Sequence, residues 1–218
     1  MDPPDFLKEY LKSTQEISEM IRILGQDCKD HFAAIQNSHS QLNKRAYVRS
    51  VFALIEGVLY NLKSATSNLG IILKNLTLNE LVVLDGTQLD INDDGNVTTK
   101  PYYPKFINNF KFSFKIYAKS IGSKYIINLS GQGWQSLCKS VKVRDRLMHP
   151  KESSDLAVSD EEILDAKKAI DWFLLNYSLS GYYAQKSFQD KLSTSKEDVS
   201  VLESNIHRIE AELSARGN

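Results

Sequence analysis

The sequence predicts an all-α protein, a bundle of helices into which one small β-hairpin is inserted. Apolar residues recur at helical spacing over most of the chain, and a single stretch near residue 90 alternates instead around an Asp-Gly pair. Only 2 of the 218 residues are cysteines, so a disulfide scaffold is excluded. Hydrophobic residues make up 42% of the chain and charged residues 25%, which suits an ordinary folded domain rather than a disordered one.

Two long helices are expected in the first third of the chain. The first covers Asp5 to about Cys28, with its apolar positions near one side and Gly25 as its weakest point. The second covers Asn43 to about Leu69 and is apolar around most of its circumference. A helix of that kind must be buried on most sides, so we expect it at the centre of the bundle.

The section 81–104 differs in kind from its neighbours. Two alternating runs flank Asp94-Gly95, a pair that favours a tight turn between antiparallel strands. The same run resembles half of a calcium-binding EF-hand loop, but its twelfth position is Pro101 where that loop needs a glutamate. A hairpin is therefore favoured over a calcium site, and a short helix over 79–84 is expected before it.

Three more helices are expected in the second half. The first runs from Pro104 to Ile121. The next ends near Met148, because Pro150 forces the residue before it out of the helical region. The last begins after the capping box at residues 159–162, where a serine is followed three positions later by a glutamate.

The C-terminal segment carries heptad-like spacing over two heptads. Its apolar positions are three and four residues apart, at Val199, Leu202, Ile206, Ile209 and Leu213. Two heptads are too few for an independent coiled coil, so we expect a packed or pairing helix. Residues 1–190 should thus form one helical domain with a hairpin insertion at about 85–104, and residues 193–218 a C-terminal helix that pairs with a partner or stays free.

The charges are balanced overall but unevenly distributed. Lys and Arg number 27, as do Asp and Glu, which argues against a surface coated for nucleic acid. Between Asp94 and Asp145, however, there is no acidic residue, while the same stretch carries many basic and aromatic residues. Such a segment suits a phosphate backbone with bases to stack. The alternative is that the aromatic residues are core and the lysines a solvated face.

Several familiar catalytic and ligand-binding motifs are absent or incomplete. Ser-Gly-Gln-Gly-Trp-Gln-Ser imitates a dinucleotide fingerprint, but Ser136 replaces its third glycine and no βαβ pattern surrounds it, so a helix cap is favoured. His31 and His39 lack a third metal ligand. Cys138 lies eleven residues before His149, too far along one helix for a nucleophile pair. No metal or cofactor is expected.

What remains is Val-Arg-Asp-Arg-Leu-Met-His-Pro, residues 143–150. Arg144 and His149 are separated by four residues at the end of a helix, and polar Asp145 follows the arginine. This resembles the Arg-x4–6-His motif of HEPN domains, which are all-helical units of four to five helices. The resemblance covers roughly residues 40–180, and only the motif is specific. The alternative is a plain helix end, where Arg144, Arg146 and His149 are cations near a helix C-terminus.

The resemblance implies a chemistry, because in many HEPN proteins the motif cleaves RNA without a metal. His149 would move a proton during attack of a ribose 2′-OH on the adjacent phosphate, and Arg144 would stabilise the charge that develops on phosphorus. Asp145 would orient one of the two. The expected products are a 2′,3′-cyclic phosphate and a 5′-hydroxyl. Two motifs would face each other in an isologous homodimer.

The resemblance also implies partners and a setting. The candidate RNA-binding residues are Lys111, Lys115, Lys119, Lys139, Lys142 and Arg146. A role as a toxin or in phage defence is expected, with an antitoxin or regulatory protein as a further partner. The few cysteines and the lack of a spanning or secretory segment favour the cytoplasm. Two rivals remain: a HEPN-like module that binds a nucleotide or a partner without cleaving RNA, and a helical adaptor.

Overall fold

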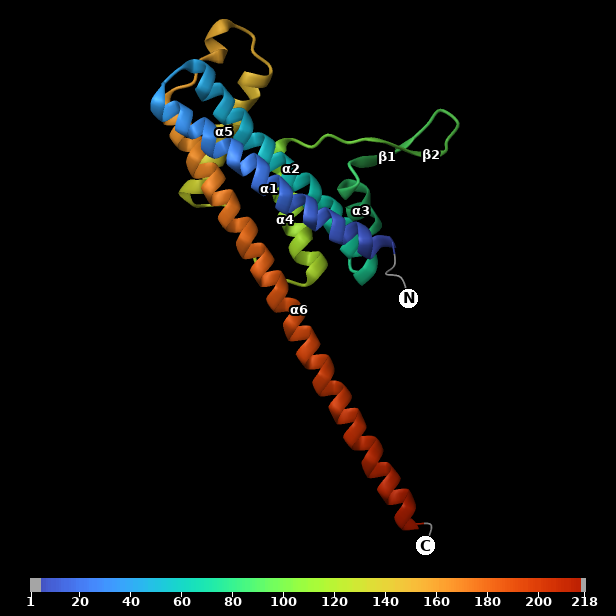
Figure 1. Ribbon diagram of the computed structural model, residues 1–218. Coiled ribbons are helices and arrows are strands. Elements are labelled where there is room, and N and C mark those ends of the chain that lie inside the picture. Colours follow the sequence, from blue (N-terminus) through green and yellow to red (C-terminus); the bar gives the residue numbers. More distant parts are fainter. Residues whose placement is uncertain (1–4, 217–218) are drawn as a thin grey trace.

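The chain forms a helical bundle with one two-stranded hairpin (Figure 1). The computed structural model describes residues 5–216 of the backbone and residues 8–190 of the side chains. Within that part the elements follow in the order α1 (Asp5–Asn37), α2 (Gln41–Leu73), α3 (Leu78–Leu84), β1 (Thr87–Ile91), β2 (Val97–Pro101), α4 (Phe106–Ile121), α5 (Gln132–Met148), the 3-10 helix η1 (Ser153–Leu156) and α6 (Asp160–Arg216). The all-α prediction and the hairpin insertion are confirmed.

Helices α1 and α2 form a long antiparallel hairpin, and both are longer than the sequence pattern predicts (Figure 1). The side chain of Ser40 caps α2 by accepting a hydrogen bond from the backbone N–H of Asn43 at 3.2 Å. α1 continues through Gly25 to Asn37. A glycine weakens a helix interior by only about 1 kcal/mol, and burial of Ile35 farther along offsets that loss.

Helix α2 is the centre of the bundle, as its apolar circumference predicts. Val51, Leu54, Ile55 and Val58 are all fully buried. The side chains of α1, α4, α5 and α6 pack around it in one continuous core. No helix in the described part is long and apolar enough to cross a membrane.

Phe110 on α4 is the hub of an aromatic cluster that joins three helices. It is fully buried, and its ring centroid lies between 5.0 and 6.4 Å from those of five other rings. These belong to Phe106, Phe114, Trp134, Trp172 and Phe173. Much of the aromatic content of the acid-free stretch is therefore core, whereas Tyr102 and Tyr103 are exposed.

The β-hairpin projects from the bundle (Figure 1). Thr87 pairs with Pro101 at its base and Ile91 with Val97 at its tip. The turn is held by the side chain of Asn92, whose Oδ1 accepts hydrogen bonds from two backbone N–H groups of the turn at 3.2 and 2.9 Å. Gly95 adopts a φ of 77°, which accounts for a glycine there.

Helix α6 is continuous over 57 residues. It begins at the predicted capping box, where Ser159 and Glu162 exchange hydrogen bonds of 2.9 and 3.2 Å between side chain and backbone. Its first part packs on the bundle, and its later part extends well beyond it (Figure 1). The heptad positions from Val199 to Leu213 fall in a part of α6 whose side chains lie outside the described residues.

Candidate functional site

An open groove of about 970 Å³ lies between the start of α4 and the end of α5. The last turns of α5 and its C-cap supply one wall, and residues 104–108 supply part of the other. The groove is lined on the α5 side by Lys142, Arg144, Asp145, Arg146 and His149. All three residues of the predicted motif therefore line one groove, together with two of the six predicted RNA-binding residues.

His149 is the C-cap of α5. Its φ and ψ of −133° and 59° are not helical, although its backbone N–H still donates to the carbonyl oxygen of Asp145 at 3.0 Å. The side chain is exposed to solvent. An exposed imidazole at the rim of an open groove can exchange a proton with a ligand there.

Arg144 lines the groove and is bonded to its neighbour Asp145. Successive residues of a helix lie about 100° apart, so the two side chains start in different directions. The Nη1 of Arg144 nevertheless donates a hydrogen bond to Oδ1 of Asp145 at 2.9 Å. The side chain of Asp145 is therefore bonded to Arg144, and its role in orienting that residue stays a prediction.

Glu56 on α2 is a second anchor of Arg144, and the sequence does not reveal it. Its Oε1 accepts a hydrogen bond from Nη2 of Arg144, in an ion pair that joins α2 to α5. The two residues are 88 positions apart, so no local spacing points to the pair. A guanidinium has five N–H groups, and these two bonds use only part of them. The remainder are available to an anion in the groove.

Arg146 is bound to the loop and helix that follow the motif. Its guanidinium donates to both carboxylate oxygens of Glu162, at 2.8 and 3.0 Å, and to the backbone oxygens of Asp155, at 3.1 Å, and Ala157. Asp155 in turn accepts hydrogen bonds from the backbone N–H groups of Lys151, at 2.7 Å, and Glu152, at 3.3 Å. The chain that leaves His149 is therefore fixed to the start of α6.

The ion pair between Arg146 and Glu162 predicts that the protein loses stability in acid. Burial raises the pKa of Glu162, but hydrogen bonds from Arg146 and from the backbone N–H of Ser159 outweigh it and hold the pKa below its ordinary 4.5. The stabilisation is fully present above pH 4.5 and is lost as the pH falls through the lowered value. In urea denaturation over a pH series, Glu162→Gln should lose less of its unfolding free energy on acidification than the wild type. Glu161→Gln is the matched control and should follow the wild type.

The predicted lysine stripe lies elsewhere and is partly neutralised. Lys119 is paired with Glu80 at 2.7 Å, and Lys139 with Asp165 at 3.2 Å. The ammonium of Lys111 lies 5.3 Å from the centroid of the Trp134 ring. The residues Lys111, Lys115 and Lys119 border a separate, mainly apolar hollow of about 550 Å³.

The free positive charge of the groove comes instead from three exposed lysines. Lys105, Lys142 and Lys151 all line it, and none forms an ion pair with a carboxylate among residues 8–190. Only Lys142 is among the residues predicted from the sequence. Lys151 follows the motif by two positions, so its closeness in sequence could have predicted its place in the groove. Lys105 lies beside the motif only because α4 packs next to α5, which the sequence does not show.

Searches of protein-family models, of curated proteins and of solved structures find no match to this chain. What the groove does has to be inferred from the residues that form it: an anchored guanidinium, an exposed imidazole and three unpaired ammonium groups.

Proposed function

We propose that the groove is the active site of a metal-independent endoribonuclease of the HEPN type. The observation that carries the proposal is that Arg144, Asp145 and His149 line one groove with the unpaired Lys105, Lys142 and Lys151. Unpaired lysines attract a phosphate backbone, and the pair of arginine and histidine supplies what transesterification at phosphorus needs.

The reaction requires two proton transfers. The 2′-oxygen attacks the adjacent phosphorus and gives up its proton to one imidazole. The bond from phosphorus to the 5′-oxygen breaks, and a second imidazole protonates that oxygen. The guanidinium of Arg144 stabilises the extra negative charge on the phosphorane through paired hydrogen bonds. The products are a 2′,3′-cyclic phosphate and a 5′-hydroxyl.

Each groove contains one histidine, so the second is supplied by another copy of the chain. An isologous homodimer with two facing motifs meets this need. Met148, which is exposed, and Ala53 border a smaller hollow of about 250 Å³ that shares Arg144 with the groove. This apolar patch beside the motif is the surface on which we expect the second copy to dock. A toxin or phage-defence role in the cytoplasm, under an antitoxin or regulator, belongs to the same proposal.

A second candidate is a HEPN-like module that binds RNA or a nucleotide without cleaving it. The observation that favours it is the pairing of Arg144 with two carboxylates, Glu56 and Asp145, which offsets much of its charge. In this case the dimer and the binding groove are retained, and the chemistry is lost.

The test is RNA cleavage by the full chain in excess EDTA. Purified wild type and the double variant Arg144→Ala/His149→Ala are incubated with mixed-sequence RNA. Wild type alone should cleave it, leaving 5′ ends that a kinase labels directly because they are hydroxyls. Equal cleavage by both preparations contradicts the proposal, since the activity is then a contaminant. A dimer by light scattering that binds RNA without cleaving it favours the binding module.

A further inference from the structure

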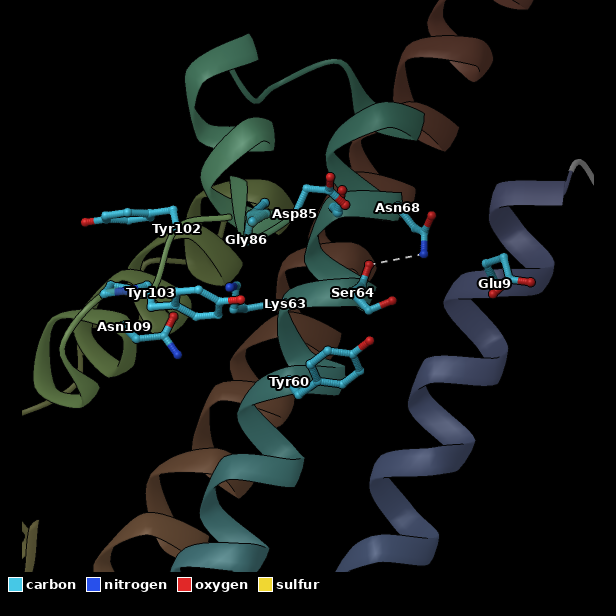
Figure 2. Close-up of a pocket in the computed structure, with 13 residues that line it drawn as sticks. Glu9, Tyr60, Lys63, Ser64, Asn68, Asp85, Gly86, Tyr102, Tyr103 and Asn109 are labelled. Atoms are coloured by element: carbon cyan, nitrogen blue, oxygen red, sulfur yellow. Dashed lines mark hydrogen bonds between the residues drawn. The ribbon is translucent and has the colours of Figure 1, made fainter. Parts of the chain in front are cut away.

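Another hollow, of about 620 Å³, shares the lining residue Pro104 with the groove, and Figure 2 shows its walls. Its walls come from α1, α2, the end of α3, the segment after β2, and α4. The side chains that matter most are Tyr60, Lys63, Asp85, Tyr102, Tyr103 and Asn109. The catalytic scheme proposed above uses none of them.

Unstacked aromatic rings are the first notable feature of this hollow. The tyrosines are exposed, Tyr103 by 88% and Tyr60 by 74% of their surface. Within residues 8–190, neither they nor Tyr102 has a ring contact with another aromatic side chain. Figure 2 shows Tyr60 and Tyr103 approaching from two different elements, α2 and the segment after β2. Rings presented in this way can stack with a planar ligand.

The polar groups of the hollow are mixed in kind. Lys63 can donate hydrogen bonds, and burial lowers its pKa while the carboxylate of Asp85 opposes that shift. Asp85 and Glu9 can accept hydrogen bonds. The Oδ1 of Asn109 is buried and has no hydrogen-bond partner in the described part of the chain.

This chemistry fits a nucleobase better than a phosphate. The lining holds one cation and two carboxylates, so a bare anion would meet net repulsion. A base offers a flat face for the tyrosines and an edge that carries both donors and acceptors. Stacking of a base on an aromatic side chain contributes about 1–3 kcal/mol and tolerates any base.

The hollow and the groove share a wall. Pro104 lines both, Lys105 to Asn108 line the groove, and Asn109 lines the hollow. The first turn of α4 separates them, which is about 5.4 Å of helix. One single strand can therefore place a base in the hollow and its neighbouring phosphate beside Lys105.

We propose that this hollow is a base-binding subsite, which holds an unpaired nucleobase of single-stranded RNA while the adjoining backbone enters the groove of Arg144 and His149. The identification of the strand as RNA rests on the proposed function. The subsite gives the nuclease a preference for unpaired over duplex RNA, because a paired base must first break its pairing and stacking, which costs a few kcal/mol.

The test measures binding without cleavage. Full-length His149→Ala protein is titrated into a fluorescein-labelled, unstructured single-stranded RNA, and anisotropy gives the affinity. Adding Tyr60→Ala or Tyr103→Ala should weaken binding by about 5- to 150-fold, the equivalent of one lost stack. The corresponding changes to phenylalanine should keep most of the affinity, since the ring and not the hydroxyl stacks. Tyr182→Ala is the matched control, because Tyr182 is 61% exposed on α6 and lines neither the hollow nor the groove.

The salt dependence separates the two parts of the surface. Lys105→Ala should reduce the slope of log affinity against log salt, because a phosphate contact is lost, whereas the tyrosine variants should lower affinity at every salt concentration without changing that slope. Duplex RNA of the same length should compete poorly with the single strand.

The outcomes distinguish the subsite from the nuclease. If Tyr60→Ala and Tyr103→Ala bind as tightly as their parent, with unchanged thermal midpoints, the subsite is refuted and the cleavage result stands on its own. If the tyrosines govern binding but wild type cleaves no RNA, the nuclease proposal fails and the subsite stands. If the His149→Ala parent binds no single-stranded RNA, the subsite is overturned together with its premise.

Discussion

Replacing His149 by alanine is expected to lower the rate of RNA cleavage by roughly 10²- to 10⁴-fold while the affinity for RNA stays nearly unchanged. In the proposed reaction the imidazole moves a proton in the transition state, but it is only one of the many groups that border the groove. It is exposed and lies beyond the last helical residue, so its removal leaves no cavity. Single-turnover cleavage measures the first quantity and anisotropy with the same RNA measures the second.

The matched control is His39→Ala. His39 is also exposed and lies between α1 and α2, with its Nδ1 3.6 Å from Oδ1 of Asp160. Its replacement should leave the cleavage rate within about twofold of wild type, since His39 does not line the groove and an exposed contact of this kind contributes little to stability. A His149→Ala protein that retains more than about a tenth of the wild-type rate would contradict a proton-transfer role for this side chain.

Replacing Phe110 by alanine is expected to lower the free energy of unfolding by about 3–5 kcal/mol. The change removes the hub of the aromatic cluster and leaves a cavity where α4, α5 and α6 meet. For a chain of this size the thermal midpoint should fall by about 6–20 °C. Because α4 and α5 form the two walls of the groove, RNA affinity should decline as well. Thermal and urea denaturation measure the loss of stability.

Phe112→Ala provides the comparison on the same helix. Phe112 is half-buried and belongs to no ring contact among the described residues. Its replacement removes the same atoms but much less buried surface, so the loss should be clearly smaller. Equal destabilisation by the two variants would contradict the burial of Phe110, rather than Phe112, in the core.

The elements that the sequence predicts well are those with a local signal. The capping box at Ser159, the Asp94-Gly95 turn and the stop before Pro150 each act within a few residues, and each is confirmed. The end of α1 is different. Gly25 suggests an early stop, but the helix persists because residues beyond it pack against α2, a contact that no local pattern contains.

The same division applies to the candidate site. Arg144, Asp145 and His149 are close in sequence, so their spacing alone predicts that they belong to one site. Glu56 is 88 positions from its partner Arg144, and only the packing of α2 against α5 reveals it. The spacing of Lys111, Lys115 and Lys119 correctly predicts one helical face, but the position of that face relative to the groove depends on tertiary packing.

The groove contains two arginines that are paired with carboxylates and three lysines that are not, and salt should affect the two groups differently. The guanidinium groups of Arg144 and Arg146 are locked to carboxylates, whereas Lys105, Lys142 and Lys151 extend into solvent. Ionic strength screens exposed charges first and barely affects short, partly buried pairs. Concentrated salt should therefore weaken the binding of a polyanion by the three lysines well before it disturbs the positions of Arg144 and Arg146. Affinity for the strand and the geometry of the groove can thus be varied independently.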